Sequence, residues 1–194
     1  MAQPFTPEQR SDIRARLFDS ARRYALETGI KKTSLDMLTA DAGISKSSFY
    51  KFYDSKELLF LEVAGYWESQ VIGKALCALK NSEGKSNKER AADAVFTAFE
   101  TIHQLGIARF LREDLPVISE ALPDDEAKRH YLSSAEIIFR ALHNAQICFS
   151  APEDIVLSVI QLMYLSILNI RDIGDSFFPA LHALVIGACD RLVA

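Results

Sequence analysis

Helical periodicity, broken by single glycines, is the feature that most constrains the fold of this chain. From Ile13 to Ala25, apolar residues recur at three- and four-residue steps, and charged residues occupy the other faces. Gly29 follows as a natural helix stop, because glycine takes the left-handed conformation without steric penalty. Gly43 breaks the next apolar stretch in the same way. No alternating β pattern or internal repeat interrupts these segments, so the sequence predicts an all-α fold.

The expected helices can be placed along the whole chain, about nine in number. Thr33 or Ser34 can cap a short helix before Gly43, and Ser45 can cap another that runs to Phe52. A long helix is expected from Lys56 to about residue 79, followed by a polar loop over 81–88. The remaining helices are expected at about 88–105, 107–113, 124–147, 153–172 and 177–193, with breaks at Gly106, Pro116, Pro123, 150–152 and 174–175.

The charge distribution differs between the two ends of the chain, whose overall net charge is −4. Residues 1–60 hold ten Lys/Arg and eight Asp/Glu, a net of +2, whereas residues 61–194 hold twelve and eighteen, a net of −6. The N-terminal part can therefore approach phosphate more easily than the acidic remainder.

Neither a metal site, a cofactor nor a membrane segment is indicated. Cys77, Cys148 and Cys189 lie far apart without metal-ligand spacing, which favours buried thiols in a reducing compartment. The N-terminus lacks a signal-peptide pattern. The longest charge-free apolar run, 155–170, has sixteen residues, whereas a spanning helix needs about 20. We therefore expect a cytoplasmic protein with no membrane partner.

The segment from residue 33 to 59 is typical of a helix-turn-helix, in which the second helix lies in the major groove of DNA. The turn Ala42-Gly43-Ile44 separates the two short helices, and the second begins with Ser45, Lys46, Ser47 and Ser48, which offer hydrogen bonds with little bulk. A capped helix with a solvated polar face is the alternative. Phe49 and Phe52, which can pack on the preceding helices, and Lys56 all fall in register with the turn. This pattern favours double-stranded DNA as the partner.

These residues resemble the signature of tetracycline-repressor-type (TetR/AcrR-type) regulators. The resemblance covers about residues 13–59 and includes Thr33-Ser34-Leu35, the run from Ala42 to Tyr53, and Ser55-Lys56-Glu57-Leu58-Leu59. Two positions depart from the usual pattern: Phe49 stands where Leu is common, and Phe52-Tyr53 reverses the common Tyr-Phe order.

The resemblance implies a three-helix DNA-binding domain over 1–55 and a helical ligand-binding and dimerisation domain over 56–194. It implies a dimer formed by the last two helices, which would bind a palindromic operator through the helix at about 45–52. Phosphate contacts would come from Thr33, Tyr50 and Lys56. Base contacts would come from Lys46, Ser47, Ser48 and Lys51.

The second domain carries many large apolar residues, most of which are expected in its core. Scattered polar groups among them suggest a mostly apolar pocket for a small-molecule effector. Trp67, on the helix that joins the two domains, is the expected sensor of occupancy. The candidate ligand contacts are Trp67, Phe96, Phe99, His103, Phe110, Phe139, His143, Met163 and Tyr164.

The last two helices are apolar over lengths too great for a one-sided surface helix, which is typical of a homodimeric four-helix interface. A buried core helix in a monomer is the alternative. The candidate interface residues are Leu157, Leu165, Leu168, Leu181, Leu184, Val185 and Ala188.

An enzyme is not indicated, because no nucleophile elbow, phosphate loop or metalloprotease motif occurs. Glu113-Asp114 is interpreted as a capping or solvated acidic turn. Two functions remain: a repressor that a small apolar effector releases from DNA, and a DNA-bound factor whose acidic domain docks another protein. A dry cavity would favour the first, and a filled core with an exposed apolar patch would favour the second.

Overall fold

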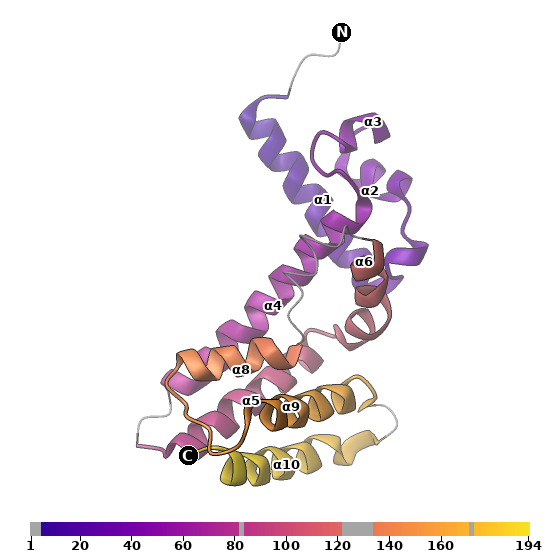
Figure 1. The fold of residues 1–194 in the computed structure, drawn as a ribbon. Coiled ribbons are helices and arrows are strands. Elements are labelled where there is room, and N and C mark those ends of the chain that lie inside the picture. Colours follow the sequence, from indigo (N-terminus) through magenta and orange to yellow (C-terminus); the bar gives the residue numbers. More distant parts are fainter. Residues whose placement is uncertain (1–4, 82–83, 122–133, 171–172) are drawn as a thin grey trace. The chain divides into compact units, whose positions relative to one another are not determined.

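A computed structural model of the chain describes residues 5–81, 84–121, 134–170 and 173–194, and its regular structure is helical (Figure 1). These residues contain no β-strand; one isolated antiparallel bridge joins Phe149 and Val193. The prediction of an all-α fold is confirmed. The chain forms two compact units. Unit 1 holds the described residues up to Tyr66 and those from Arg109 to Ala121, and unit 2 holds the rest.

Unit 1 is built from short helices around a small apolar core. Leu17, Leu38, Phe49 and Phe60 are completely buried in this core. Its elements are α1 (Pro7–Glu27), the 3-10 helix η1 (Ile30–Lys32), α2 (Leu35–Ala42), α3 (Lys46–Phe49), the first part of α4 (Lys56–Lys80), the π-helix η2 (Phe110–Asp114) and α6 (Leu115–Ala121).

The compact units divide the chain differently from the boundary that the sequence suggested at residues 55 and 56. Leu59, Phe60 and Val63, on the first turns of α4, are completely buried. This part of α4 therefore belongs to unit 1, as does the segment from Arg109 to Ala121.

Side-chain caps define the ends of α1 and α2. Thr6 accepts a hydrogen bond from the Gln9 amide, and Pro7 occupies the first turn of α1, where its missing N–H costs nothing. Ser34 accepts from the Met37 amide at 3.2 Å at the start of α2. Gly43 ends α2 in the left-handed region, with φ +68° and ψ 34°. These are the stops and starts expected of a helix-turn-helix.

The helix after this turn is shorter than the predicted Ser45–Phe52. Its α-helical part is Lys46–Phe49. The chain then tightens, because the Lys51 and Phe52 amides donate to the carbonyls three residues earlier, at 3.1 and 2.8 Å. Helical hydrogen bonding thus reaches Phe52, but with the geometry of a 3-10 turn.

The predicted break at Pro116 is wrong. Pro116 lies in α6 directly after the π-turn η2, and the helix continues through it to Ala121.

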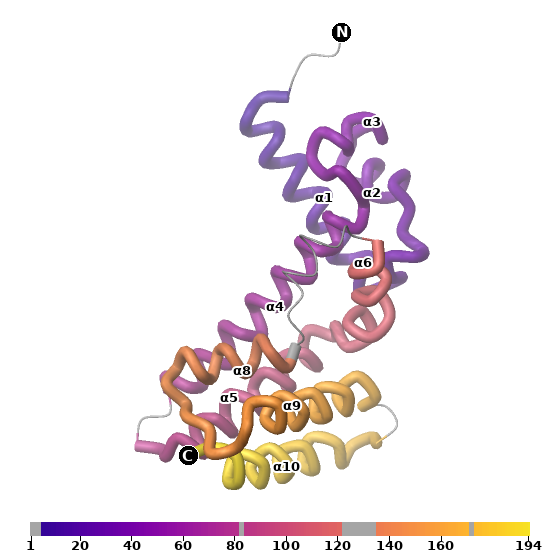
Figure 2. The backbone as a smooth tube through the Cα atoms, in the orientation of Figure 1, coloured from indigo at the N-terminus to yellow at the C-terminus, as the bar shows by residue number. Residues whose placement is uncertain are grey.

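Unit 2 consists of the second part of α4 with α5 (Asn87–Gln104), α8 (Ser134–Asn144), α9 (Glu153–Ile167), the 3-10 helix η4 (Gly174–Ser176) and α10 (Phe177–Leu192). Helix α5 packs on α10, and α8 packs on α9 (Figure 2). The first part of the predicted helix 124–147 lies outside the described residues. None of the helices described is long and apolar enough to cross a membrane.

Gly43 offers a direct test of the turn. We expect Gly43→Val to lower the free energy of unfolding by about 1–2 kcal/mol, because a β-branched residue is strained in the left-handed region. Gly65→Ala is the matched control: it adds a methyl group in an exposed part of α4 with nothing within 4 Å, so it should stabilise by about 0.5–1 kcal/mol. Urea unfolding would measure both. Equal effects of the two substitutions would contradict a strained turn.

Candidate nucleic-acid interface

The N-terminal end of α3 presents a group of small hydroxyls. Ser45 accepts from the Ser48 amide at 3.3 Å and so caps the helix. Its hydroxyl also lies 3.0 Å from the Ser47 hydroxyl and donates to that of Ser48 at 3.0 Å. Ser45 and Ser47 are exposed, and Ser48 is half-buried. This surface can exchange hydrogen bonds with a ligand that approaches the helix end.

Lys46 is exposed beside these serines, and its ammonium lies 2.8 Å from the carboxylate of Asp36 on α2. An exposed pair of this kind contributes little to stability. The ion pair directs the Lys46 side chain from α3 toward α2. The sequence alone did not predict this pairing.

The opposite side of α3 fixes the helix to the core through aromatic contacts. The Phe49 ring is completely buried and meets the rings of Tyr50 and Tyr53 at 5.6 and 5.9 Å between centroids. Tyr50 itself is 55% exposed. Lys51 is also exposed, with its ammonium 5.4 Å from the Phe5 ring centroid. Tyr50 and Lys51 are thus available at the surface next to the serines.

Tyr53 connects the end of this segment to α4 and α1. Its hydroxyl donates to the Glu62 carboxylate at 3.0 Å, and Arg14 pairs with the same carboxylate at 2.8 Å. Burial, reinforced by Glu62, raises the pKa of Tyr53 to about 12. Tyr53 therefore stays a neutral donor at neutral pH and keeps the residues after α3 in place.

Lys56 uses two of its three N–H donors inside the protein. Its ammonium donates to the backbone carbonyls of Ile30 and Thr33, both at 2.8 Å. The side chain is half-buried, so these two bonds fix the direction of the third donor. The family resemblance implies a phosphate contact at Lys56, and this geometry leaves one N–H for it.

Thr33 has a different place from the one that the sequence suggested. Its side chain is buried, and its hydroxyl donates to the Gly29 carbonyl at 2.8 Å and lies 3.3 Å from the Thr28 hydroxyl. These bonds stabilise the turn between α1 and α2. The structure thus gives the Thr33 side chain an internal role instead of an exposed one.

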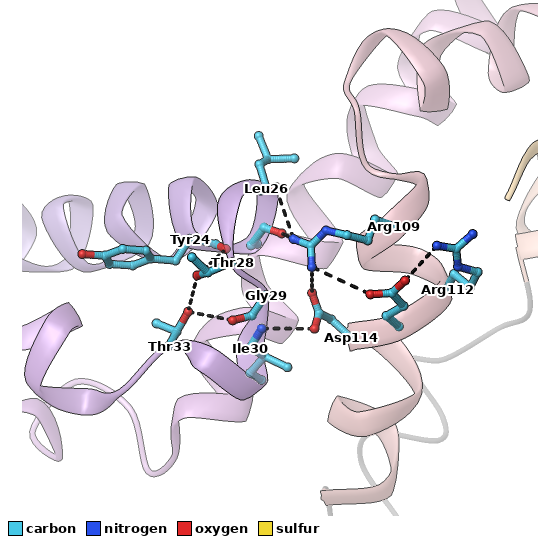
Figure 3. Close-up of polar contacts among 11 residues, drawn as sticks. Tyr24, Leu26, Thr28, Gly29, Ile30, Thr33, Arg109, Arg112 and Asp114 are labelled. Atoms are coloured by element: carbon cyan, nitrogen blue, oxygen red, sulfur yellow. Dashed lines mark hydrogen bonds and ion pairs between the residues drawn. The ribbon is translucent and has the colours of Figure 1, made fainter. Parts of the chain in front are cut away.

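A segment remote in sequence packs against the same turn (Figure 3). Arg109 donates to the carbonyls of Ala25 and Leu26 at 2.6 and 3.2 Å, and Asp114 accepts from the Ile30 amide at 3.1 Å. Burial raises the pKa of Asp114 against the opposing effects of this hydrogen bond and of Arg109. The interpretation of Glu113-Asp114 as a solvated turn is wrong for Asp114, whose side chain is 5% exposed. No local signal revealed this contact across 84 residues.

The candidate ligand residues divide between the two units and differ in burial. Phe110 belongs to unit 1, and the others belong to unit 2. There Trp67, Phe99, Met163 and Tyr164 are buried, Phe96 and Phe139 are half-buried, and His103 and His143 are exposed. A cavity of about 30 Å³ in unit 2 has Met163 as its only lining residue from this set. In this state it has room for about one water molecule.

The candidate interface residues divide between the core and the surface. Leu168, Leu181 and Val185 are buried inside unit 2, so these three are core positions of the unit. Leu165 and Leu184 are exposed, and Leu157 and Ala188 are half-buried. Sequence reasoning missed three other exposed apolar residues on α9 and α10: Ile155, Leu162 and Ile186.

The described residues contain no group of three or more His, Cys, Asp or Glu side chains that could hold a metal ion.

The comparison with known families agrees with this geometry. Residues 17–63 match the family of bacterial regulatory proteins called tetR, and this stretch contains the whole α2–Gly43–α3 arrangement and Lys56. Over these residues the chain is similar to the tetR family. Proteins of this family are DNA-binding regulators and not enzymes.

A curated relative of this chain is distant in sequence. The uncharacterized HTH-type transcriptional regulator YerO of Bacillus subtilis is 26% identical over 127 residues, which cover 62% of this chain and 40% of YerO. The matched segment therefore spans about two fifths of that relative's length.

Solved structures share the fold over nearly the whole chain. A regulator from Marinobacter aquaeolei has a TM-score of 0.60 at 20% identity and covers 97% of this chain and 99% of its own. RolR, solved in complex with resorcinol, has a TM-score of 0.54 at 17% identity, with 94% and 89% covered.

Proposed function

We propose that this chain is a transcriptional repressor of the tetR family that binds a palindromic operator as a homodimer and is released by a small apolar effector. The observation that carries the proposal is the exposed group of Ser45, Lys46 and Ser47 at the start of α3, beyond the left-handed turn at Gly43. Short polar side chains at this end of a recognition helix suit base edges in the major groove.

The proposed contacts divide into two classes. Ser45, Lys46, Ser47 and Ser48 read bases from the N-terminal end of α3, and the exposed Lys51 reads bases from the turn that follows the helix. Tyr50 and Lys56 bind phosphate, since one is exposed and the other has a donor left over from its two carbonyl bonds. Phosphate contacts position the protein without reading sequence. The buried Thr33 side chain is left out of both classes.

Substitution should separate the two classes. Tyr50→Phe and Lys56→Ala should weaken binding to every DNA sequence, and Lys56→Ala should lower the slope of log affinity against log salt by about one. Lys46→Ala and Ser48→Ala should instead relax preference at single base pairs, by about 1–3 kcal/mol each. Fluorescence anisotropy with an operator selected from random DNA would measure both. If all four variants lose only sequence preference, the assignment of contacts is wrong.

Dimerisation is proposed through the exposed apolar face of α9 and α10. Leu162 and Leu184 are 68% and 61% exposed, although Ile160 and Val185 on the same two helices are buried. Near Leu184, the exposed residues Ala183 and Gly187 are small, and a side chain at Gly187 would meet nothing within 4 Å. A second copy of these helices can therefore approach closely and form a two-fold interface. A dimer supplies two α3 helices, which must lie about 34–36 Å apart to enter successive major grooves.

We expect Leu162→Glu to give a folded monomer, because a buried unpaired charge opposes association. Leu26→Glu is the matched control: Leu26 is an exposed leucine on α1, which belongs to unit 1 and contributes no residue to the proposed interface, so this variant should remain dimeric. Sedimentation velocity at micromolar concentration would distinguish them. A wild-type chain that sediments as a monomer would refute the dimer.

The effector is proposed to enter the cavity of unit 2, which is lined only by apolar and sulfur-containing side chains from α5, α8, α9, α10 and the segment around Phe149. Its small volume means that the side chains must move apart to admit a ligand. A ligand changes the DNA-bound population only through its different affinities for the two conformations. RolR, which shares the fold, was solved with the small aromatic resorcinol.

Effector binding and operator binding should weaken each other by one common factor, about 5–150-fold for typical allosteric coupling. Resorcinol and related phenols would be titrated while following Trp67 emission, with and without operator DNA. Val159→Ile, which adds one methylene to the cavity wall, should weaken the phenol but leave operator affinity alone. Phenol binding that leaves operator affinity unchanged would favour the alternative, in which the acidic domain docks another protein.

A further inference from the structure

The turn from Gly29 to Thr33 is held from two sides by charged side chains. The Ile30 amide donates to Asp114, and the Ile30 carbonyl accepts from Lys56. Lys56 also binds the Thr33 carbonyl, which closes the turn. A single residue of the backbone therefore connects the carboxylate of Asp114 to the ammonium of Lys56.

The backbone at Gly29 lies very close to the side chains of Arg109 and Asp114. Gly29 has φ +83°, and a Cβ atom built on it would lie 2.8 Å from both the Arg109 Nη1 and the Asp114 Oδ1 atoms. Only glycine lets the two side chains approach the backbone at this point. The turn and the remote segment are thus fitted to each other.

The π-helical turn η2 explains why Arg109 and Asp114 act together. Residues five apart point in different directions in an α-helix, which has 3.6 residues per turn. The i to i+5 hydrogen bonding of a π-helix brings them to the same side. Here the Leu115 amide donates to the Phe110 carbonyl, and Arg109 Nη1 lies 3.8 Å from Asp114 Oδ2.

Arg109 also ends α1. The last carbonyls of a helix lack partners, and α1 has no basic residue in its last turn. Arg109 provides that charge from another part of the chain by binding the Ala25 and Leu26 carbonyls. Its guanidinium is thereby fixed where it can orient Asp114 (Figure 3).

We propose that Asp114, oriented by Arg109, is a positioning residue for DNA binding: it holds the Gly29–Thr33 turn so that the third N–H of Lys56 faces a phosphate. This inference rests on the proposed function, because it concerns a phosphate contact. It adds that two residues outside the helix-turn-helix set the geometry of that contact.

The test is a double-mutant cycle on operator affinity. Asp114→Ala should weaken operator binding about 10-fold in the wild-type background, the effect typical of losing a hydrogen bond to a charged group. In a Lys56→Ala background the same change should cost less than about twofold, because the contact that Asp114 positions is already absent. In the matched Lys46→Ala background it should again cost about 10-fold. Equal losses of operator affinity in the Lys56→Ala and Lys46→Ala backgrounds would overturn the proposal.

Conservative variants guard against a folding defect. Asp114→Asn keeps an oxygen that can accept from the Ile30 amide, so operator affinity should fall by no more than about threefold. If Asp114→Ala does not fold, Arg109→Gln replaces it in the cycle. We then expect a smaller loss, again confined to proteins that retain Lys56. A loss that is the same with and without Lys56 would overturn the proposal in this form too.

Hydrogen exchange separates this inference from the proposed function. If the wild-type chain selects no sequence from random DNA, the proposed operator binding fails. The rate of hydrogen exchange at the Ile30 amide still reports, without DNA, whether Asp114 holds the turn. Arg109→Gln or Asp114→Ala should raise this rate by at least about 10-fold. The exchange rates of α5 amides should not change. Unchanged exchange at Ile30 would show that Asp114 does not hold the turn.

Discussion

The ends of helices must find hydrogen-bond partners, and the short elements of unit 1 depend on this constraint. Three elements of this unit are short: η1 has three residues, α3 has four and α2 has eight. Most of their backbone groups therefore lie within one turn of a helix end. Side chains provide the partners. Ser34 and Ser45 cap two N-termini, Lys56 binds the carbonyls of Ile30 and Thr33, and Arg109 binds those at the end of α1.

The same capping groups form the candidate DNA surface. Ser45 caps α3 and lies among the exposed hydroxyls at its start. Lys56 closes a turn and retains one donor. A residue that is fixed by two internal bonds loses little freedom when it makes a third, so the phosphate contact proposed here costs little ordering entropy. Stability and recognition thus use the same atoms, and a substitution at Lys56 should affect both.

Local signals allowed much of unit 1 to be predicted from the sequence. Gly43 in the left-handed conformation, Ser45 as a cap and the start of α4 at Lys56 each follow from a residue and its immediate neighbours. The contact of Asp114 with Ile30 could not be predicted, because it joins segments 84 residues apart and depends on a π-turn without a sequence signature. Thr33 shows the same limit, since its burial depends on how the turn folds back on Gly29.

Helices α9 and α10 show why the candidate residues of unit 2 were harder to predict. Both helices are apolar on more than one face, so periodicity alone does not separate the core side from the exposed side. The structure places Ile160 and Val185 inside and Leu162 and Leu184 outside. The inner residues line the cavity of about 30 Å³, and the outer residues form the face proposed for the dimer. Packed helices shift as units when a core is forced to expand. Under the proposed function, a ligand that enlarges this cavity would therefore strain the same two helices that carry the proposed dimer face.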